Sequence, residues 1–261
     1  LRYNTVKFDV YDEYLSNGND SGSRDYSRAT PVVGVVYALN PAVNLYASAA
    51  KGFETPTLNE LFYSAGGTGF NFGLAAARSQ HLEVGAKALV GDASRVNVAL
   101  FQVSTDDELV VADSTGGRTS YKNAGKTLRQ GIEVSAETAW RRDLRSRVSL
   151  SHLRAVYDEA FNTVFQSKAI TVPAGNAIPG VPRTTLFGDL AWTPVAGITA
   201  AVEGVYRSKV YVEDSNTATP ASSYALANVR LTAEQRSGHW RFSEFARVDN
   251  LFDRQYIGSV I

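Results

Sequence analysis

Apolar and polar residues alternate one for one along several stretches of this chain, and this period of two limits the fold more than any other feature. Between 81 and 90, apolar side chains hold the even positions, whereas histidine, charged side chains and glycine hold most of the odd ones. A β-strand points successive side chains to opposite faces, and a helix would mix the two sets. We therefore predict strands with one apolar and one polar face. The apolar face is expected to carry Val84, Ala86, Ile132, Val134, Ala200 and Val202, and the polar face Glu83, Lys87, Glu133, Glu137, Glu203 and Arg207.

Short and long connections alternate along the chain. This asymmetry is typical of an up-and-down barrel that crosses a membrane, with tight turns at one end and long loops at the other. We predict an all-β, antiparallel, transmembrane β-barrel with about eleven strands in this chain. Short turns are expected at 39–42, 91–94, 141–143, 193–197 and 236–238, and long loops at 12–30, 54–79, 113–118, 161–183 and 214–223.

Each of the three tryptophans, Trp140, Trp192 and Trp240, flanks a short turn. Aromatic side chains gather where a membrane barrel meets water, so we expect one girdle at the short-turn end. A soluble β-sandwich is the alternative, but the small outward residues would give it a thin core. His152 and Glu244 fall on the apolar side of their strands, which indicates a bulge or a shifted register there.

Composition excludes several classes of protein. The chain has no cysteine, so it forms no disulfide, thiolate metal site or cysteine nucleophile. Its 26 basic and 26 acidic residues cancel, so no net charge attracts nucleic acid. Three separated histidines and no Ser–His–acid pattern give no reason to expect an enzyme. No apolar run approaches the ~18 residues that a membrane helix needs.

Four local motifs, in the same order along the chain, resemble those of TonB-dependent receptors of Gram-negative outer membranes. Residues 51–61 are similar to the segment in which a strand of that family enters an extracellular loop, although Glu54 and Thr55 depart from its commoner residues. Residues 71–85 and 123–133 resemble two further strand motifs, and residues 250–256 resemble the motif before the family's final strand. The first and last motifs are matched by Gly52, Phe53, Pro56 and Glu60, and by Asn250, Leu251, Phe252, Asp253 and Tyr256.

The resemblance implies a barrel of roughly 22 strands, closed by an N-terminal plug domain, in the outer membrane. Residues 1–261 would then be the C-terminal portion of that barrel, with the plug domain and the last strand lying outside this sequence. The family implies outer-membrane lipid as surroundings, TonB as a partner through a missing N-terminal segment, and a monomer. It implies no resident cofactor or metal.

The function implied by the resemblance is TonB-energised uptake of a scarce nutrient, with a ferric siderophore as the expected ligand. Receptors for haem or cobalamin remain alternatives within the family, and a structural barrel or adhesin is the alternative of another class. The loop at 54–79 is expected to bind the ligand, because aromatic rings and a cation suit an anionic, partly aromatic chelate. Aromatics that merely pack on one another are the alternative. Copper is disfavoured, since Cu(I) prefers sulfur ligands and the chain has neither Met nor Cys. The candidate binding residues are Tyr63, Phe70, Phe72, Arg78 and His81, of which His81 is the candidate ligand for haem.

Overall fold

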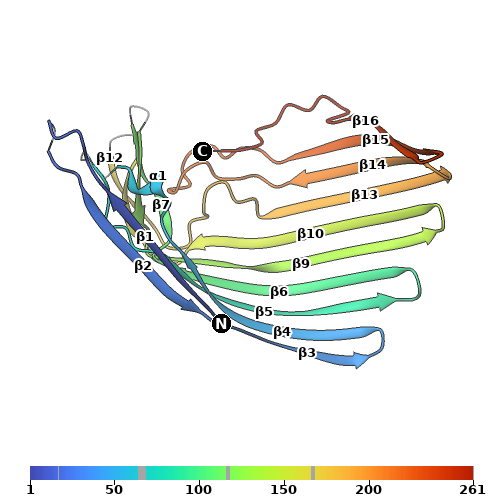
Figure 1. Cartoon of the computed structure of the whole chain (residues 1–261), viewed down its shortest axis with the longest axis horizontal. Helices are drawn as coiled ribbons and strands as arrows, with labels where there is room; N and C mark the ends of the chain where they lie inside the picture. Colours follow the sequence, from blue (N-terminus) through green and yellow to red (C-terminus); the bar gives the residue numbers. More distant parts are fainter. Residues whose placement is uncertain (17, 64–68, 116–117, 166–167, 261) are drawn as a thin grey trace.

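One curved antiparallel sheet forms most of the molecule (Figure 1). The computed structural model describes residues 1–261 except 17, 64–68, 116–117, 166–167 and 261. Strands that follow one another along the sheet also follow one another in the chain, which is the up-and-down topology that the connections predict. The sheet contains, in chain order, β3 (Val32–Asn40), β4 (Val43–Glu54), β5 (Ala77–Val90), β6 (Ser94–Asp106), β9 (Lys126–Arg141), β10 (Leu144–Tyr157), β13 (Thr184–Val195), β14 (Ile198–Arg207), β15 (Tyr224–Ser237) and β16 (Trp240–Val248).

Three further hairpins extend the sheet at the end with the long connections (Figure 1). The expectation that 12–30 and 161–183 are loops throughout is therefore wrong. The polar composition of these segments is typical of loops, but a strand that is surrounded by water needs no apolar face. The hairpins are β1 (Arg2–Val10) with β2 (Gly22–Thr30), β7 (Leu109–Thr115) with β8 (Arg118–Asn123), and β11 (Phe161–Phe165) with β12 (Lys168–Val172).

The two ends of the sheet differ as the sequence predicts. All the short turns lie at one end, on the right in Figure 1, and the hairpins and long loops lie at the other. The main sheet has ten strands where about eleven were expected, and the three hairpins add six more in the described part of the chain. The tryptophans lie beside the short turns, where the indole of Trp192 donates to Asp143 at 3.0 Å and that of Trp140 to Ser146 at 2.9 Å.

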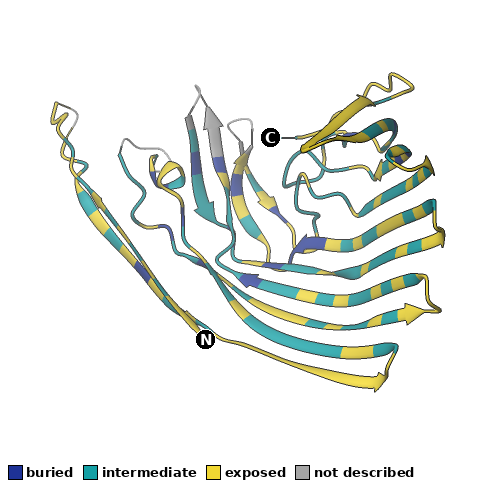
Figure 2. Ribbon diagram, turned by 45° about the vertical axis from the view of Figure 1, so that its right-hand side comes forward, coloured by how far each residue is buried: buried dark blue, intermediate teal, exposed yellow. Residues whose placement is uncertain are grey.

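The register separates the two faces as predicted. Residues directly opposite in antiparallel strands share a face, and Val84 lies opposite Leu100, which lies opposite Ile132. Val202 lies opposite Leu190 and Val229, and is 55% exposed. Figure 2 shows exposed and partly buried residues alternating along several of these strands. A row of large, exposed apolar side chains is the surface that lipid covers in a membrane barrel.

The predicted bulges at His152 and Glu244 are absent from the described strands. The register runs unbroken from Arg145 to the end of β10, and through the whole pairing of β15 with β16. His152 therefore does lie on the apolar face, opposite Ile132, and its Nδ1 is 2.9 Å from the hydroxyl of Thr184. Glu244 lies opposite Ala233 on the same face. Beyond Ala233 this face of β15 becomes polar, so the prediction failed because both residues lie near the edges of the apolar band.

Most of the buried residues lie at the long-loop end (Figure 2), although Ala201, Glu203 and Asn228 are buried within the sheet. Ala124, Tyr157 and Val172 form the central cluster, against which Phe161 and Ile178 pack. No helix in the described part of the chain is long and apolar enough to cross a membrane.

Candidate functional site

A short helix organises the loop in which the candidate binding residues lie. Helix α1 (Leu58–Leu61) begins after Thr57, whose hydroxyl accepts from the backbone N–H of Glu60. The Glu60 carboxylate accepts in return from the backbone N–H of Thr57 at 2.7 Å, which completes a capping box. Pro56 and Leu61 are fully buried on either side. The motif at 51–61 is therefore a structural device that fixes how the chain leaves β4.

The aromatic residues of this loop pack on one another. The ring of Phe70 lies 5.0 Å from that of Phe62 and 5.7 Å from that of Phe72, between ring centroids. Tyr63 contacts Phe62 at 5.9 Å. Phe72 also covers Gly22 of β2, where a β-carbon would meet its ring at 2.5 Å. The structure thus brings Tyr63, Phe70 and Phe72 into one cluster, with Phe62, which sequence reasoning did not include.

Arg78 and His81 lie on opposite faces of β5. They are three positions apart along the strand, and successive side chains of a strand point to opposite faces. Arg78 forms an ion pair of 2.5 Å with Asp107. His81 shares the polar face with Glu83, and its Nε2 is 2.7 Å from the hydroxyl of Ser79. The five candidate residues therefore do not form one contiguous site.

The polar face carries an ion-pair network that the sequence did not reveal. Glu203 is 6% exposed, and its carboxylate accepts hydrogen bonds from the two terminal guanidinium nitrogens of Arg247, at 2.6 and 3.0 Å. Arg230 lies 3.3 Å from Glu203 and 3.7 Å from Asp189. A buried carboxylate needs such partners, because removing them would strand a charge away from water. The alternation predicted the polar position of Glu203, but its partners come from strands far along the chain.

A second polar group lines the middle of the same face. Tyr46, Glu83, Lys87 and Glu133 border a cavity of about 470 Å³. The ammonium of Lys87 lies 5.4 Å from the centre of the Tyr46 ring, within the range of a cation–π contact. These side chains would contact whatever occupies the lumen of a closed barrel.

Hydrogen bonds tie the long loops together above the sheet. The Tyr157 hydroxyl donates to Asp214 at 2.7 Å, and burial raises the pKa of that carboxyl. Glu213 behaves in the opposite way: burial alone would raise its pKa, but hydrogen bonds from Ser215, Thr217 and Ala218 outweigh this and lower it. The loop after β14 therefore holds two neighbouring carboxyl groups with opposite pKa shifts.

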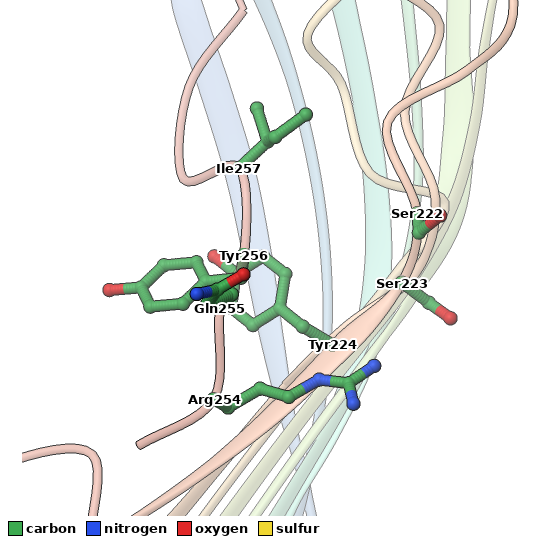
Figure 3. A pocket seen from close by; sticks show the side chains of 7 residues that line it. All are labelled: Ser222, Ser223, Tyr224, Arg254, Gln255, Tyr256 and Ile257. Atoms are coloured by element: carbon green, nitrogen blue, oxygen red, sulfur yellow. The ribbon is translucent and has the colours of Figure 1, made fainter.

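The motif at 250–256 forms a braced turn after β16. The side-chain carbonyl of Asn250 accepts from the backbone N–H of Arg254 at 2.9 Å, and its amide donates back to the Arg254 carbonyl at 3.0 Å. The ring of Tyr256 packs 4.5 Å from that of Tyr224 (Figure 3). Asn250 has a φ of 51°, a conformation that asparagine tolerates better than most residues. This motif, too, has a structural role.

Comparison with known proteins places these features in a family. The sequence model of the TonB-dependent receptor-like β-barrel family matches residues 1–251 of this chain. The metal-pseudopaline receptor CntO of Pseudomonas aeruginosa is 26% identical over 98% of this chain and 34% of its own length. The chain thus spans about one third of the length of the curated relatives it matches.

Solved structures share the fold. The copper transporter OprC superposes with a TM-score of 0.74 at 16% identity, over 98% of this chain and 38% of that one. The siderophore receptor PiuA of Acinetobacter baumannii gives a TM-score of 0.72 at 17% identity, over 93% and 34%. The apolar outer band, the unequal ends and the match over residues 1–251 show that this chain belongs to the TonB-dependent receptor β-barrel family and lies in the outer membrane.

Proposed function

We propose that the full-length protein is a TonB-energised receptor that takes up a chelated metal, and that its ligand is a ferric siderophore. Membership of the family carries this proposal. A curated relative is named as a metal-pseudopaline receptor, and the solved neighbours include siderophore receptors. The protein is accordingly a transporter rather than an enzyme, and this chain supplies part of its wall and loops.

The loop cluster supports a ligand with aromatic rings and negative charge. Phe70 and Phe72 offer stacking faces, and Tyr63 adds a ring with a hydroxyl. Arg78 supplies a cation, although an anionic ligand must compete with Asp107 for it. His81 lies on the polar face, where a chelate would pass on its way inward. We propose these five residues as separate contacts rather than as one pocket: His81 on the polar face, and Arg78 with the aromatic cluster at the loop end of β5, beyond the ~9–11 residues that cross the membrane.

Ligand binding to the full-length receptor tests the proposal. Arg78→Ala and Phe72→Ala should each weaken binding of its ferric chelate at least ~10-fold, a loss of about 1.4 kcal/mol. Asp107→Asn is the matched control, because it breaks the same ion pair and leaves the cation in place. That variant should bind as well as the wild type or better. If Asp107→Asn and Arg78→Ala weaken binding equally, the ion pair merely holds the loop, and Arg78 is no ligand contact.

Growth on defined iron sources identifies the ligand. A strain that lacks the receptor should regain growth on one ferric siderophore when it carries the intact gene. Rescue by haem alone, abolished by His81→Ala, would overturn the siderophore assignment in favour of haem. The panel should also include metal-loaded pseudopaline and cobalamin. If no nutrient restores growth, the protein is a structural barrel or an adhesin.

A further inference from the structure

Two of the long loops lie against each other at the end of the wall. The first loop, residues 173–183, connects β12 to β13, and the second loop, residues 208–223, connects β14 to β15. The backbone N–H of Gly180 in the first loop donates to the carbonyl of Tyr211 in the second at 3.0 Å. Both loops, together with the end of β10, border a cavity of about 670 Å³. The contacts between the two loops therefore enclose part of this cavity.

A pair of asparagine side chains joins the loops. The side-chain amide of Asn176 donates to the backbone carbonyls of Asp214 and Ser215 at 3.0 and 2.9 Å. The side chain of Asn216 accepts from the backbone N–H of Ala177 at 2.7 Å and donates to the carbonyl of the same residue at 2.9 Å. Each loop thus supplies one side chain that binds the backbone of the other. We call these four hydrogen bonds the asparagine clasp.

Both loops are anchored on the same residue of the wall, Tyr157 of β10. In the first loop, the backbone N–H of Gly175 donates to the Tyr157 carbonyl at 2.7 Å, and that of Ile178 donates to the carbonyl of Ala155 at 3.1 Å. The second loop reaches β10 through a side chain instead, because the Tyr157 hydroxyl donates to Asp214 at 2.7 Å. Tyr157 is 1% exposed, so this anchor lies in the buried cluster.

We propose that the asparagine clasp makes the two loops one cooperative unit, which leaves the wall as a whole and opens the cavity when it does. Proteins open locally in contiguous units whose hydrogen bonds break together. If one loop moved alone, partly buried backbone groups of the other would lose their partners, which costs more than an exposed loss. Asn176 and Asn216 both border the cavity, so breaking the clasp removes part of its lining.

Hydrogen exchange resolved to single amides, in the full-length receptor in detergent, tests this unit. Asn216→Gly removes one half of the clasp and keeps a residue that tolerates the φ of 57° at this position. The reporters are the amides of Gly175 and Ile178, because they bond to β10 and not to Asn216. Their exchange should rise at least ~10-fold, since the bonds to β10 would open together with the rest of the unit.

The reverse experiment removes the other half of the clasp. Coupling between two sites is reciprocal, so Asn176→Ala should raise exchange at Thr217 and Ala218 by a similar factor. These two amides bond to Glu213 within the second loop, and not to Asn176. Asn19→Gly and Asn19→Ala are the matched controls, because the side chain of Asn19 accepts from a backbone N–H two residues away in another long connection. Both controls should leave all four amides unchanged.

Three results would overturn the unit. An increase confined to Ala177, which Asn216 binds directly, would show that the loops open independently. An increase of equal size along β5 and β6 would show that the variants destabilise the whole wall. An equal increase in the Asn19 variants would show that the four amides do not report on the clasp.

Discussion

At the scale of single residues, glycine decides how the polar face of the wall packs. The Tyr46 ring lies across Gly85 of the neighbouring strand, where a β-carbon would be 2.5 Å from both the ring and the carbonyl oxygen of Val98. This carbonyl belongs to the backbone of the sheet, so it cannot move unless the whole strand shifts. Gly188 offers a contrast, because nothing lies within 4 Å of the β-carbon it would carry. The same residue type is thus required at one position and replaceable at the other.

Gly85→Ala should lower the free energy of unfolding by roughly 1–3 kcal/mol, since it forces atoms into occupied space. Gly188→Ala should leave stability unchanged or raise it slightly, because alanine suits a strand better than glycine does. Urea titrations of the full-length protein in lipid vesicles measure both. Similar losses in the two variants would show that space at Gly85 is not the constraint.

Glu213 controls the loop after β14 in a manner that depends on pH. Its carboxylate accepts from the backbone N–H groups of Ser215, Thr217 and Ala218 at 2.5, 2.6 and 3.0 Å. Because these bonds lower the pKa of Glu213, its stabilisation is complete above its ordinary value of 4.5 and is lost as the pH falls through the lower folded pKa. Asp214 contributes with the opposite sign, since burial raises its pKa.

Glu213→Gln should speed hydrogen exchange at the three amides by roughly tenfold at pH 7, which corresponds to about 1.4 kcal/mol. The difference between variant and wild type should shrink as the pH falls below 4.5. Glu54→Gln is the control, because Glu54 is exposed and lies on another strand. A difference that persists unchanged to pH 3 would contradict the assigned role of the carboxylate.

At the scale of elements, neighbouring residues of each membrane-spanning strand lie on opposite faces, one toward lipid and the next on the polar side. Val148 is exposed on the apolar face near the middle of β10, and Ser149 borders the cavity on the polar face. Val148→Arg should cost ~2–4 kcal/mol of folding free energy in vesicles, whereas Ser149→Arg should cost less than ~1 kcal/mol. The same urea titration separates them. Equal costs would mean that the two faces meet the same environment.

The sequence predicted the elements that obey this alternation and missed those that do not. Strands β5, β9 and β14 could be identified because their apolar positions repeat every second residue. Strands β2 and β12 could not, because outside the lipid nothing requires them to be apolar on one face. In the candidate site, Arg78 and His81 were expected to bind one ligand together, although an odd spacing of three along a strand places them on opposite faces. The ion pair with Asp107 could not be predicted, since pairing across the sheet decides it.

At the scale of the whole molecule, the unequal ends give the wall a direction. Short turns lie at one end, and the hairpins, the buried cluster and the loop hydrogen bonds lie at the other (Figure 1). In outer-membrane barrels the long loops face outward, where a ligand arrives, and the short turns face the periplasm. The proposed binding residues depend on this orientation.

Labelling of single cysteines in intact cells tests that orientation most directly, because this chain has no cysteine of its own. Ser222→Cys lies in the exposed part of a long loop, and Asp92→Cys lies in an exposed short turn. Each is placed in the full-length protein, with any other cysteine replaced, and treated with a maleimide that cannot cross the outer membrane. We expect Ser222→Cys to be labelled in intact cells, and Asp92→Cys only after the outer membrane is permeabilised. Labelling of Asp92→Cys in intact cells, or protection of Ser222→Cys, would contradict an outer-membrane barrel with its long loops outward.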